Sequence, residues 1–441
     1  MKVLHILNHF LPQQTAGTEV YTWALCKQLQ QSGVEVEVMI PNYGDHLSVF
    51  YEYDGLNVTK FAEPSVVDRS LIMGFRKPDG LQTFKQFLQQ TKPRVVHFHE
   101  LAGSNGITIH HVQAAKESGA AVLMTFHLAT NTCKTGTLVQ EGKHLCEGKI
   151  DLRKCSRCFL QSRGFEGIAP VLVPLSVGIH NTGINVSAWG NRLGTALGTA
   201  SLIGKTKKDF DLLISHCDRV VSLTNWYKSV LLLNGVPEEK ITVVAQGLPT
   251  AVSSLPLQEK EIAKPIKLLF LGRINPFKGL HLLIEAIQML PQTAIRLDIY
   301  GNSDDINYEN YWKKQTTDYR NINWKGKLKQ SEVVSVMKQY DALCLCSTFS
   351  EMSPLVIQEA RAAGIPVIAS GVYGNAEQIE HGKTGLLFEF NNIKSLRDQL
   401  QQCVSNPSIL AQMRQHITKP RSFTDVAKEY YMIYKQIGKS E

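Results

Sequence analysis

Residues 351–370 read EMSPLVIQEARAAGIPVIAS and place Glu351 and Glu359 eight positions apart, across the expected start of a helix. The flanking apolar segments Ala342–Cys346 and Pro366–Ser370 are predicted to be strands. A helix between two apolar strands is typical of a parallel sheet that is covered on both faces. The segment therefore predicts an α/β fold.

The spacing of the two glutamates indicates a long ligand. Eight helical steps correspond to about 12 Å, or less if Glu351 lies in the loop before the helix. Carboxylates that flank one glycosidic bond face each other within roughly 5–9.5 Å, so this pair suits the two ends of a ligand better. A ribose and a sugar joined by a diphosphate have about this span. The alternative is that both are ordinary solvated helix residues.

Both halves of the chain alternate between predicted strands and helices. The first half opens with a strand at Val3–Leu7, a helix near Glu19–Ser32 and a strand at Val34–Ile40, which is a βαβ unit. Its further strand candidates are Val95–Phe98, Val122–Phe126, Arg219–Leu223 and Ile241–Val244. The second half adds, besides the two strands named above, Lys267–Leu271, Ile295–Tyr300, Ile322–Trp324 and Gly385–Phe388.

The pattern restarts after a polar segment between Leu248 and Pro265, which we interpret as a linker. We therefore expect an N-terminal domain at 1–250 and a C-terminal domain at 265–420. Both are predicted to be Rossmann-like, doubly wound parallel-sheet domains that face a central cleft, because ligands of such sheets bind beyond the carboxyl ends of the strands. A helical tail at about 424–441 is expected to pack back on the first domain.

Length and composition limit the classes to which the protein can belong. The chain has 441 residues, 43% of them apolar, which fits two domains with substantial cores. No apolar run reaches the ~18 residues of a membrane span, and the start resembles no secretory signal, so we expect a cytoplasmic protein. The net charge of +8 favours anionic ligands or an anionic membrane surface, but it is too diffuse to indicate nucleic acid.

The loop after Lys267–Leu271 offers two cations. Gly272 and Arg273 are followed by Lys278, so that a guanidinium fork and an ammonium group suit a diphosphate. The alternative is a surface loop with two unrelated cations. In the first domain Gly17 precedes a helix whose N-terminus suits a phosphate. No G-x-G-x-x-G follows the first strand and no P-loop motif occurs, which argues against nicotinamide dehydrogenases and P-loop enzymes.

Taken together these stretches resemble the large family of retaining GT-B glycosyltransferases with the E-x7-E motif, the glycosyltransferase family 4 type. The resemblance covers nearly the whole chain. Its strongest parts, in the order of the family, are the loop Gly272–Gly279, the element Glu351–Ser370 and the segment Gly374–Phe388.

The resemblance implies roles for particular residues. Arg273 and Lys278 would neutralise the donor diphosphate, Glu359 would hold the ribose hydroxyls and Glu351 would face the transferred sugar. The loop at Ser353, Pro354 and Leu355 would pass near the sugar and phosphates, although it departs from the commoner Glu-Gly-Phe-Gly version.

Histidines follow two strands of the first domain. The resemblance places His127 beside the reacting sugar, where a packed structural histidine is the alternative. His97, His99 and Glu100 are weaker candidates for the acceptor side. The implied reaction retains the anomeric configuration, and cations and helix N-termini stabilise the departing diphosphate, so no catalytic metal is expected.

Four of the nine cysteines lie close together in the sequence. Cys133, Cys146, Cys155 and Cys158, the last two in a C-x-x-C element, offer the four ligands of a structural zinc site. Free thiols, a disulfide and an iron–sulfur centre are the alternatives. The cluster would form an insertion near 130–160 on the acceptor side. The remaining cysteines are expected to fill the core.

The expected function is transfer of a sugar from a nucleotide-diphosphate donor to a glycan or lipid-linked acceptor, in assembly of a surface polysaccharide or glycolipid. An epimerase or phosphorylase of the same fold is a second interpretation, and a catalytically idle sugar-nucleotide-binding or scaffold protein is a third. Peripheral contact with the inner face of an anionic membrane is also expected. The glycine-rich stretch 178–204 is too irregular to assign; the alternatives are a mobile loop that contacts a lipid-linked acceptor and simple disorder.

Overall fold

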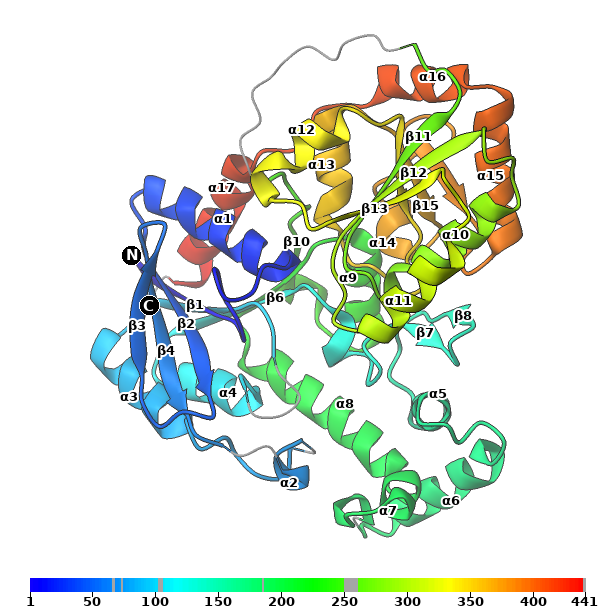
Figure 1. Cartoon of the computed structure of the whole chain (residues 1–441). Coiled ribbons are helices and arrows are strands. Elements are labelled where there is room, and N and C mark those ends of the chain that lie inside the picture. Colours follow the sequence, from blue (N-terminus) through cyan, green and yellow to red (C-terminus); the bar gives the residue numbers. More distant parts are fainter. Residues whose placement is uncertain (66–67, 73, 102–105, 185, 250–260, 439–441) are drawn as a thin grey trace. The chain divides into compact units, whose positions relative to one another are not determined.

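The computed structural model describes residues 1–65, 68–72, 74–101, 106–184, 186–249 and 261–438 (Figure 1). The chain divides into two units. Unit 1 comprises Met1–Ala245 together with Phe423–Glu441, and unit 2 comprises Gln246–Ser422. Each unit contains one large sheet with helices on its faces, so the expected α/β fold with two Rossmann-like domains is confirmed. Most of the linker expected between Leu248 and Pro265 lies outside the described residues.

Unit 1 is built on an eight-stranded sheet in the order β10-β9-β6-β5-β1-β2-β4-β3. The central strands are buried on both faces, as their continuous apolar sequences require. The strands are β1 (Lys2–Ile6), β2 (Glu35–Tyr43), β3 (Val49–Tyr53), β4 (Leu56–Glu63), β5 (Val95–Phe98), β6 (Ala121–Phe126), β9 (Arg219–Ser222) and β10 (Ile241–Val243).

One edge of this sheet corrects the expectation of a purely parallel sheet. β3 pairs antiparallel with β4, whereas the other pairs are parallel. The two strands are joined by Asp54 and Gly55, whose φ angles are +50° and +73°. Two left-handed residues in a two-residue loop are typical of a hairpin whose twist matches its strands.

The helices of unit 1 cover both faces of the sheet. α1 (Gly17–Gln31) and α17 (Phe423–Ile437) lie side by side on one face, where they share a core with β1 and β2 (Figure 1). The other helices are α2 (Arg69–Ile72), α3 (Leu81–Thr91), α4 (Ile109–Glu117), α5 (Leu152–Ser162), α6 (Ala169–Asn181), α7 (Arg192–Leu197), α8 (Thr199–His216) and α9 (Asn225–Leu233).

The glycine-rich stretch 178–204 is largely helical in its described residues, and contains the end of α6, all of α7 and the start of α8. Its glycines serve close packing. A Cβ on Gly198 would lie 2.5 Å from Ser187 Cα, and one on Gly194 would lie 2.5 Å from Trp189 Cβ. The expectation of an irregular or disordered segment was therefore wrong, because glycine here permits close contacts between short helices rather than chain freedom.

Unit 2 is built on a six-stranded, fully parallel sheet in the order β13-β12-β11-β14-β15-β16. The strands are β11 (Ile266–Leu271), β12 (Ile295–Tyr300), β13 (Ile322–Gly326), β14 (Ala342–Leu345), β15 (Val367–Ser370) and β16 (Gly385–Phe388). The helices are α10 (Leu280–Gln288), α11 (Ile306–Gln315), α12 (Val333–Met337), α13 (Leu355–Ala363), α14 (Tyr373–Ala376), α15 (Ile393–Ser405) and α16 (Ser408–His416).

Two apolar cores lie on the opposite faces of this second sheet. One joins the sheet to α10, α15 and α16, and the other joins it to α12 and α13. The parallel arrangement brings the carboxyl ends of β11 and β14 to one edge, beside the start of α13. Among the described residues, none of the helices combines the length and the apolar composition that crossing a bilayer requires.

Candidate active site

Glycine allows the loop after β11 to pack against the end of β14 in unit 2. Lys278 ends a short 3-10 helix, Pro276–Lys278, and is followed by Gly279 with a φ of +66°. A Cβ on Gly279 would lie 1.8 Å from the carbonyl oxygen of Cys346. No larger residue fits without moving the backbone, so the glycine brings the predicted cation Lys278 next to the loop that carries Glu351.

Lys278 and Glu351 form an ion pair. The Lys278 Nζ atom lies 2.5 Å from Glu351 Oε1, and Ser347 Oγ donates to the same oxygen at 2.7 Å. The Glu351 side chain is 8% exposed and that of Lys278 20%. Lys278 also lies over the ring of Phe349, 5.1 Å from its centroid. The structure thus joins two predicted site residues that are 73 positions apart in the sequence.

The backbone that carries Glu351 is held by a second close contact. A Cβ on Gly374, in α14, would lie 2.0 Å from the Glu351 carbonyl oxygen. This contact explains why the later segment Gly374–Phe388 belongs to the same site as the glutamate pair. Helix α13 begins after Pro354, so Glu351 lies in the loop and Glu359 in the helix.

Glu359 is buried inside unit 2. It accepts a hydrogen bond from Gln330 Nε2 at 2.5 Å, and burial raises the pKa of its carboxyl group to about 7, against the smaller opposing effect of that hydrogen bond. A carboxyl group with such a pKa changes its charge near neutral pH. This is the protonation behaviour that functional sites often show.

The remaining predicted donor residues surround the start of α13. Ser353 is buried, and its carbonyl oxygen accepts from Gln246 Nε2 at 3.1 Å. Pro354 occupies the position before the helix, and Leu355 is its first residue. Gly272 and Arg273 directly follow β11, where Arg273 is exposed and makes no ion pair with the described residues. Its guanidinium group is therefore available to an anion.

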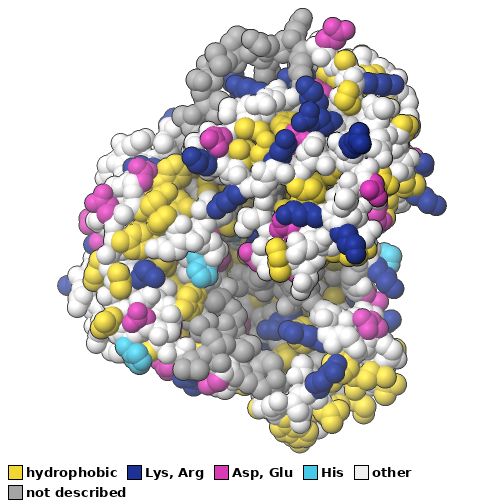
Figure 2. All heavy atoms as spheres, in the orientation of Figure 1, with side chains coloured by type: hydrophobic (Ala, Val, Ile, Leu, Met, Phe, Trp, Pro, Cys, Tyr) yellow, Lys and Arg dark blue, Asp and Glu magenta, His cyan; other side chains and the backbone are white. Residues whose placement is uncertain are grey.

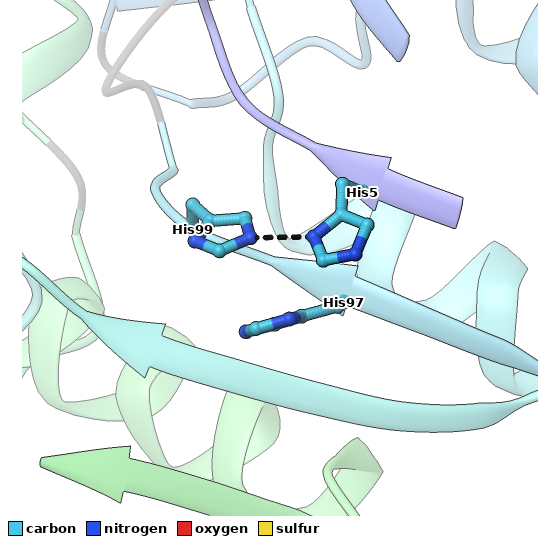
Figure 3. A group of neighbouring side chains, drawn as sticks. All are labelled: His5, His97 and His99. Carbon is cyan, nitrogen blue, oxygen red and sulfur yellow. Dashed lines mark hydrogen bonds between the residues drawn. The ribbon is translucent and has the colours of Figure 1, made fainter. Parts of the chain in front are cut away.

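A chain of hydrogen-bonded histidines, His5, His99 and His127, lies at the carboxyl ends of β1, β5 and β6 in unit 1. Figure 3 shows His5 and His99 beside His97. His5 Nδ1 lies 2.9 Å from His99 Nε2, and His99 Nδ1 lies 3.1 Å from His127 Nε2. Burial lowers the pKa values of His5 and His127 to about 3, although part of the His127 side chain is exposed. The rings are therefore neutral at neutral pH.

The tautomers of these three histidines are set together, because each neutral ring donates through one nitrogen and accepts through the other. His5 Nε2 is buried without a partner among the described residues. A buried N–H without an acceptor is rarer than an unpaired acceptor, which favours donation from His5 to His99 and from His99 to His127. This arrangement leaves the proton of His127 on Nδ1.

His5, His97 and His99 also form the one group of described residues whose potential metal-ligating atoms all lie within 4.8 Å of one another. Both ring nitrogens of His97 are already used, by Tyr434 at 2.7 Å and by Thr125 at 2.8 Å. We therefore interpret the group as a hydrogen-bond network. His97 and His99 are fully buried, so the expectation that they line an acceptor surface was wrong.

Glu19 occupies the helix start that was predicted to bind a phosphate near Gly17. Its carboxyl group accepts from Gln14 Nε2 at 2.7 Å. Burial raises the pKa of Glu19 to about 7. Sequence reasoning missed this residue, although a glutamate three positions after the residue that precedes a helix is a known capping pattern.

The four clustered cysteines line one cavity of unit 1, whose volume is about 30 Å³. All nine cysteines are free, and the five outside the cluster, Cys26, Cys217, Cys344, Cys346 and Cys403, are buried as expected of core residues. Two further residues that sequence reasoning missed are Ser347 and Gln330, which hold the two predicted glutamates. Ser347 lies four positions before Glu351 in the loop after β14, whereas Gln330 lies 29 positions before Glu359, in the short 3-10 helix Gln330–Glu332.

Apolar side chains are exposed on and around α6 and α7 in unit 1 (Figure 2). They include Val171 and Leu193, each with 65% of its surface exposed. Singly exposed apolar residues are ordinary, but several on neighbouring helices are less so. The expected contact with a membrane surface remains a prediction.

Comparison with known proteins gives two family matches. Residues 256–419 match the model described as glycosyl transferases group 1, and residues 16–164 match the model described as glycosyl transferase 4-like domain. The two matches fall on the two halves of the chain that sequence analysis separated.

Curated relatives match part of the chain. The putative glycosyltransferase YtcC of Bacillus subtilis is 27% identical over 38% of this chain and 45% of its own length. The amylovoran biosynthesis glycosyltransferase AmsK of Erwinia amylovora is 26% identical over 44% of this chain and 49% of its own length. The matched region thus spans about half the length of these relatives.

Solved structures share the fold over nearly the whole chain. Anabaena Alr3699/HepE, solved in complex with UDP and glucose, has a TM-score of 0.62 and 13% identity, and 99% of this chain and 100% of that chain are covered. Sucrose-phosphate synthase from Thermosynechococcus elongatus has a TM-score of 0.64 and 15% identity, with 99% and 98% covered.

Proposed function

Because the chain belongs to the GT-B glycosyltransferases of the family 4 type, we propose that it transfers a sugar from a nucleotide diphosphate to a hydroxyl group, with retention of the anomeric configuration. The acceptor is a glycan or a lipid-linked glycan, and the product belongs to a surface polysaccharide or glycolipid. The amylovoran relative supports the polysaccharide assignment, and the UDP complex of the structural neighbour supports a nucleotide-sugar donor.

The observation that carries the proposal is the ion pair between Lys278 and Glu351 at the carboxyl ends of β11 and β14. It holds a cation and a carboxylate beside the start of α13, where a helix N-terminus favours negative charge. Lys278, with the exposed Arg273, would bind the diphosphate, and Glu351 would face the sugar. The charge that develops on the departing diphosphate would be stabilised by these cations, so the reaction needs no metal for that step.

The donor class is tested by thermal stabilisation with UDP, GDP, ADP and their sugar conjugates. We expect one nucleotide to raise the melting temperature of the wild-type protein, and Arg273→Ala to abolish that rise, because an exposed guanidinium group can fork onto two phosphate oxygens. Arg320→Ala, a variant of the same unit outside the predicted site, serves as the matched control. The absence of a shift with every nucleotide would refute a nucleotide-sugar site.

An assay for sugar transfer distinguishes an enzyme from a catalytically idle binding protein. A nucleotide that binds in an Arg273-dependent manner, without hydrolysis or transfer of its sugar to any glycan acceptor tested, would favour the binding or scaffold role. Anomeric retention is read from the configuration of the product linkage by nuclear magnetic resonance.

Glu359 makes donor affinity depend on pH. An ionised carboxylate accepts hydrogen bonds from both ribose hydroxyls, whereas the neutral acid donates one proton itself. Since burial raises the pKa of Glu359 to about 7, we expect the affinity for the nucleotide sugar to fall as the pH decreases from 8 to 6, approaching about tenfold per unit below the pKa. Calorimetry with the intact nucleotide sugar measures this, because its diphosphate has no proton to lose in that range.

The raised pKa of Glu359 predicts that the stability of the free protein increases as the pH falls, whereas its donor affinity decreases. A carboxyl group whose folded pKa exceeds its ordinary value of 4.5 stabilises the fold fully below that value, and the contribution is lost as the pH rises through about 7. Glu359→Gln is the isosteric control. It should bind the donor more weakly than the wild-type protein, and its donor affinity should not change between pH 6 and pH 8. An unchanged pH profile in Glu359→Gln would show that another group titrates.

A further inference from the structure

The segment 132–160 of unit 1 places four cysteines on three pieces of backbone. Cys133 follows the short 3-10 helix Ala129–Asn131, Cys146 follows a two-stranded hairpin, and Cys155 and Cys158 lie one turn apart on α5. The hairpin consists of β7 (Val139–Gln140) and β8 (His144–Leu145), paired antiparallel. A hairpin plus a C-x-x-C turn is an arrangement that can close a tetrahedral metal site.

All four thiol side chains line the same cavity of about 30 Å³. A space of that size suits a single ion. The sulfur atoms stand farther apart than the histidine nitrogens of the same unit, since only those all lie within 4.8 Å among the described residues. A cysteine side chain has one rotatable bond, so a metal that ligates at about 2.3 Å can draw the sulfurs inward.

The charges around the cavity identify the class of metal. Lys134, Lys149 and Lys154 line it together with the thiols, and no carboxylate does. Zn²⁺ with four thiolates carries a formal net charge of about −2, which nearby lysines stabilise. Magnesium and calcium ions need oxygen ligands, whereas four thiols line this cavity.

Backbone N–H groups also point at the sulfurs. Glu141 N donates to Cys158 Sγ and Asp151 N donates to Cys155 Sγ, each at 3.4 Å. A thiolate accepts such bonds better than a neutral thiol, and hydrogen bonds to the ligands help to orient them. Two of the four sulfurs therefore already have the partners that a metal-bound thiolate uses.

Left-handed residues are frequent in the part of this segment before α5. Of the five left-handed residues between 136 and 148, two are the non-glycine residues Leu138 and Glu141. It is tied to α9 through Asn234 Nδ2, which donates to the Gly148 carbonyl oxygen at 2.9 Å, and through Asn234 Oδ1, which accepts from Ile150 N at 2.8 Å. The Thr132 and Tyr227 hydroxyl groups, 3.1 Å apart, form a third link. A metal cross-link stabilises a short segment of tight turns, because its binding free energy adds to the free energy of folding.

We infer that Cys133, Cys146, Cys155 and Cys158 bind one structural zinc ion, which cross-links the segment between His127 and α5. On binding, the four thiols lose their protons to water, and the metal forms four sulfur bonds. No electron is transferred. The zinc orders the backbone that follows β6 and takes no part in the sugar transfer itself, so the inference stands or falls independently of the proposed function.

Metal analysis of the full-length protein tests the inference directly. Protein purified under reducing conditions, without a metal-affinity tag, should contain about one zinc per chain by mass spectrometry. Replacement by Co²⁺ should give the thiolate-to-cobalt absorption of a tetrahedral site. Metal-free wild-type protein that fails to take up either ion would overturn the inference, whatever its transferase activity.

Thiol titration and variants supply a second measurement. In the native protein the four thiols should react with a chromogenic thiol reagent only after a chelator is added, and immediate reaction of all four would contradict the inference. Cys155→Ser combined with Cys158→Ser should lower the zinc content to background. Cys403→Ala, which removes an equally small buried thiol from α15 of unit 2, should retain zinc. Retention of full zinc by the double variant would also refute the site.

Discussion

Replacing Lys278 with methionine is expected to lower kcat for sugar transfer by about 10²–10³-fold, the usual effect of removing one group that stabilises developing negative charge. Methionine keeps most of the aliphatic side chain and removes the ammonium group. Steady-state kinetics with the nucleotide sugar identified by thermal stabilisation measure the loss. The affinity for the free nucleoside diphosphate should fall as well, because Lys278 would contact the diphosphate before and after the reaction.

Because Lys278 is paired with Glu351, Lys278→Met also leaves Glu351 without its cation. A double variant that removes both charges serves as the control. Without Lys278 the Glu351 carboxylate is left nearly buried, with the Ser347 hydroxyl as its remaining side-chain partner, and an unpaired buried charge destabilises a fold. Lys278→Met combined with Glu351→Gln removes both charges and should restore the melting temperature. It should not restore transfer. Recovery of transfer in the double variant would mean that Lys278 acts only as the structural partner of Glu351.

Single variants of Glu351 and His127 distinguish a role in sugar transfer from a role in nucleotide binding. Glu351→Gln should depress transfer more than nucleoside diphosphate affinity, because Glu351 would face the sugar. His127→Ala should likewise lower transfer and leave the nucleotide shift unchanged, since His127 belongs to unit 1. Equal loss of nucleoside diphosphate affinity in Lys278→Met and Glu351→Gln would contradict this division.

Removal of α17 is expected to unfold unit 1. The helix buries Phe423, Val426, Tyr430, Ile433 and Tyr434 against α1 and the sheet. Large apolar side chains contribute about 1.5–3 kcal/mol each when buried, so five of them match the entire stability of an ordinary domain, about 5–15 kcal/mol. A chain ending at Ser422 should therefore show rapid proteolysis of unit 1. Persistence of a protease-resistant unit 1 would refute this.

A single substitution in α17 tests the packing of this helix with a smaller perturbation than its removal. Tyr434→Phe removes the hydroxyl that lies 2.7 Å from His97 Nδ1 and leaves a buried nitrogen unpaired, at a cost of about 1–3 kcal/mol in the free energy of unfolding. Tyr431→Phe, on the partly exposed side of the same helix, is the matched control and should change the stability little. Urea unfolding followed by circular dichroism compares the two variants.

Sequence periodicity predicted the repeated β/α units well, because buried parallel strands such as β11 are continuous apolar runs. The antiparallel edge β3 was missed, although Asp54-Gly55 between two apolar-rich segments is a hairpin signal. The E-x7-E spacing located Glu351 and Glu359 but gave no sign of their partners. Lys278 and Gln330 reach the glutamates from other segments of the chain, so these contacts depend on the three-dimensional packing. Ser347 lies in the same loop as Glu351, four positions before it.

The crossing of α17 back to unit 1 has a consequence for biosynthesis. A ribosome completes all of unit 2 before the residues of α17 leave its exit tunnel. At typical elongation rates of about 5–20 residues per second, the apolar face of α1 and the sheet waits on the order of tens of seconds for its last helix. During that interval the nascent first unit is a natural client for chaperones. A message cut short before the codons of α17 would yield a chain whose second unit is folded and whose first unit is not.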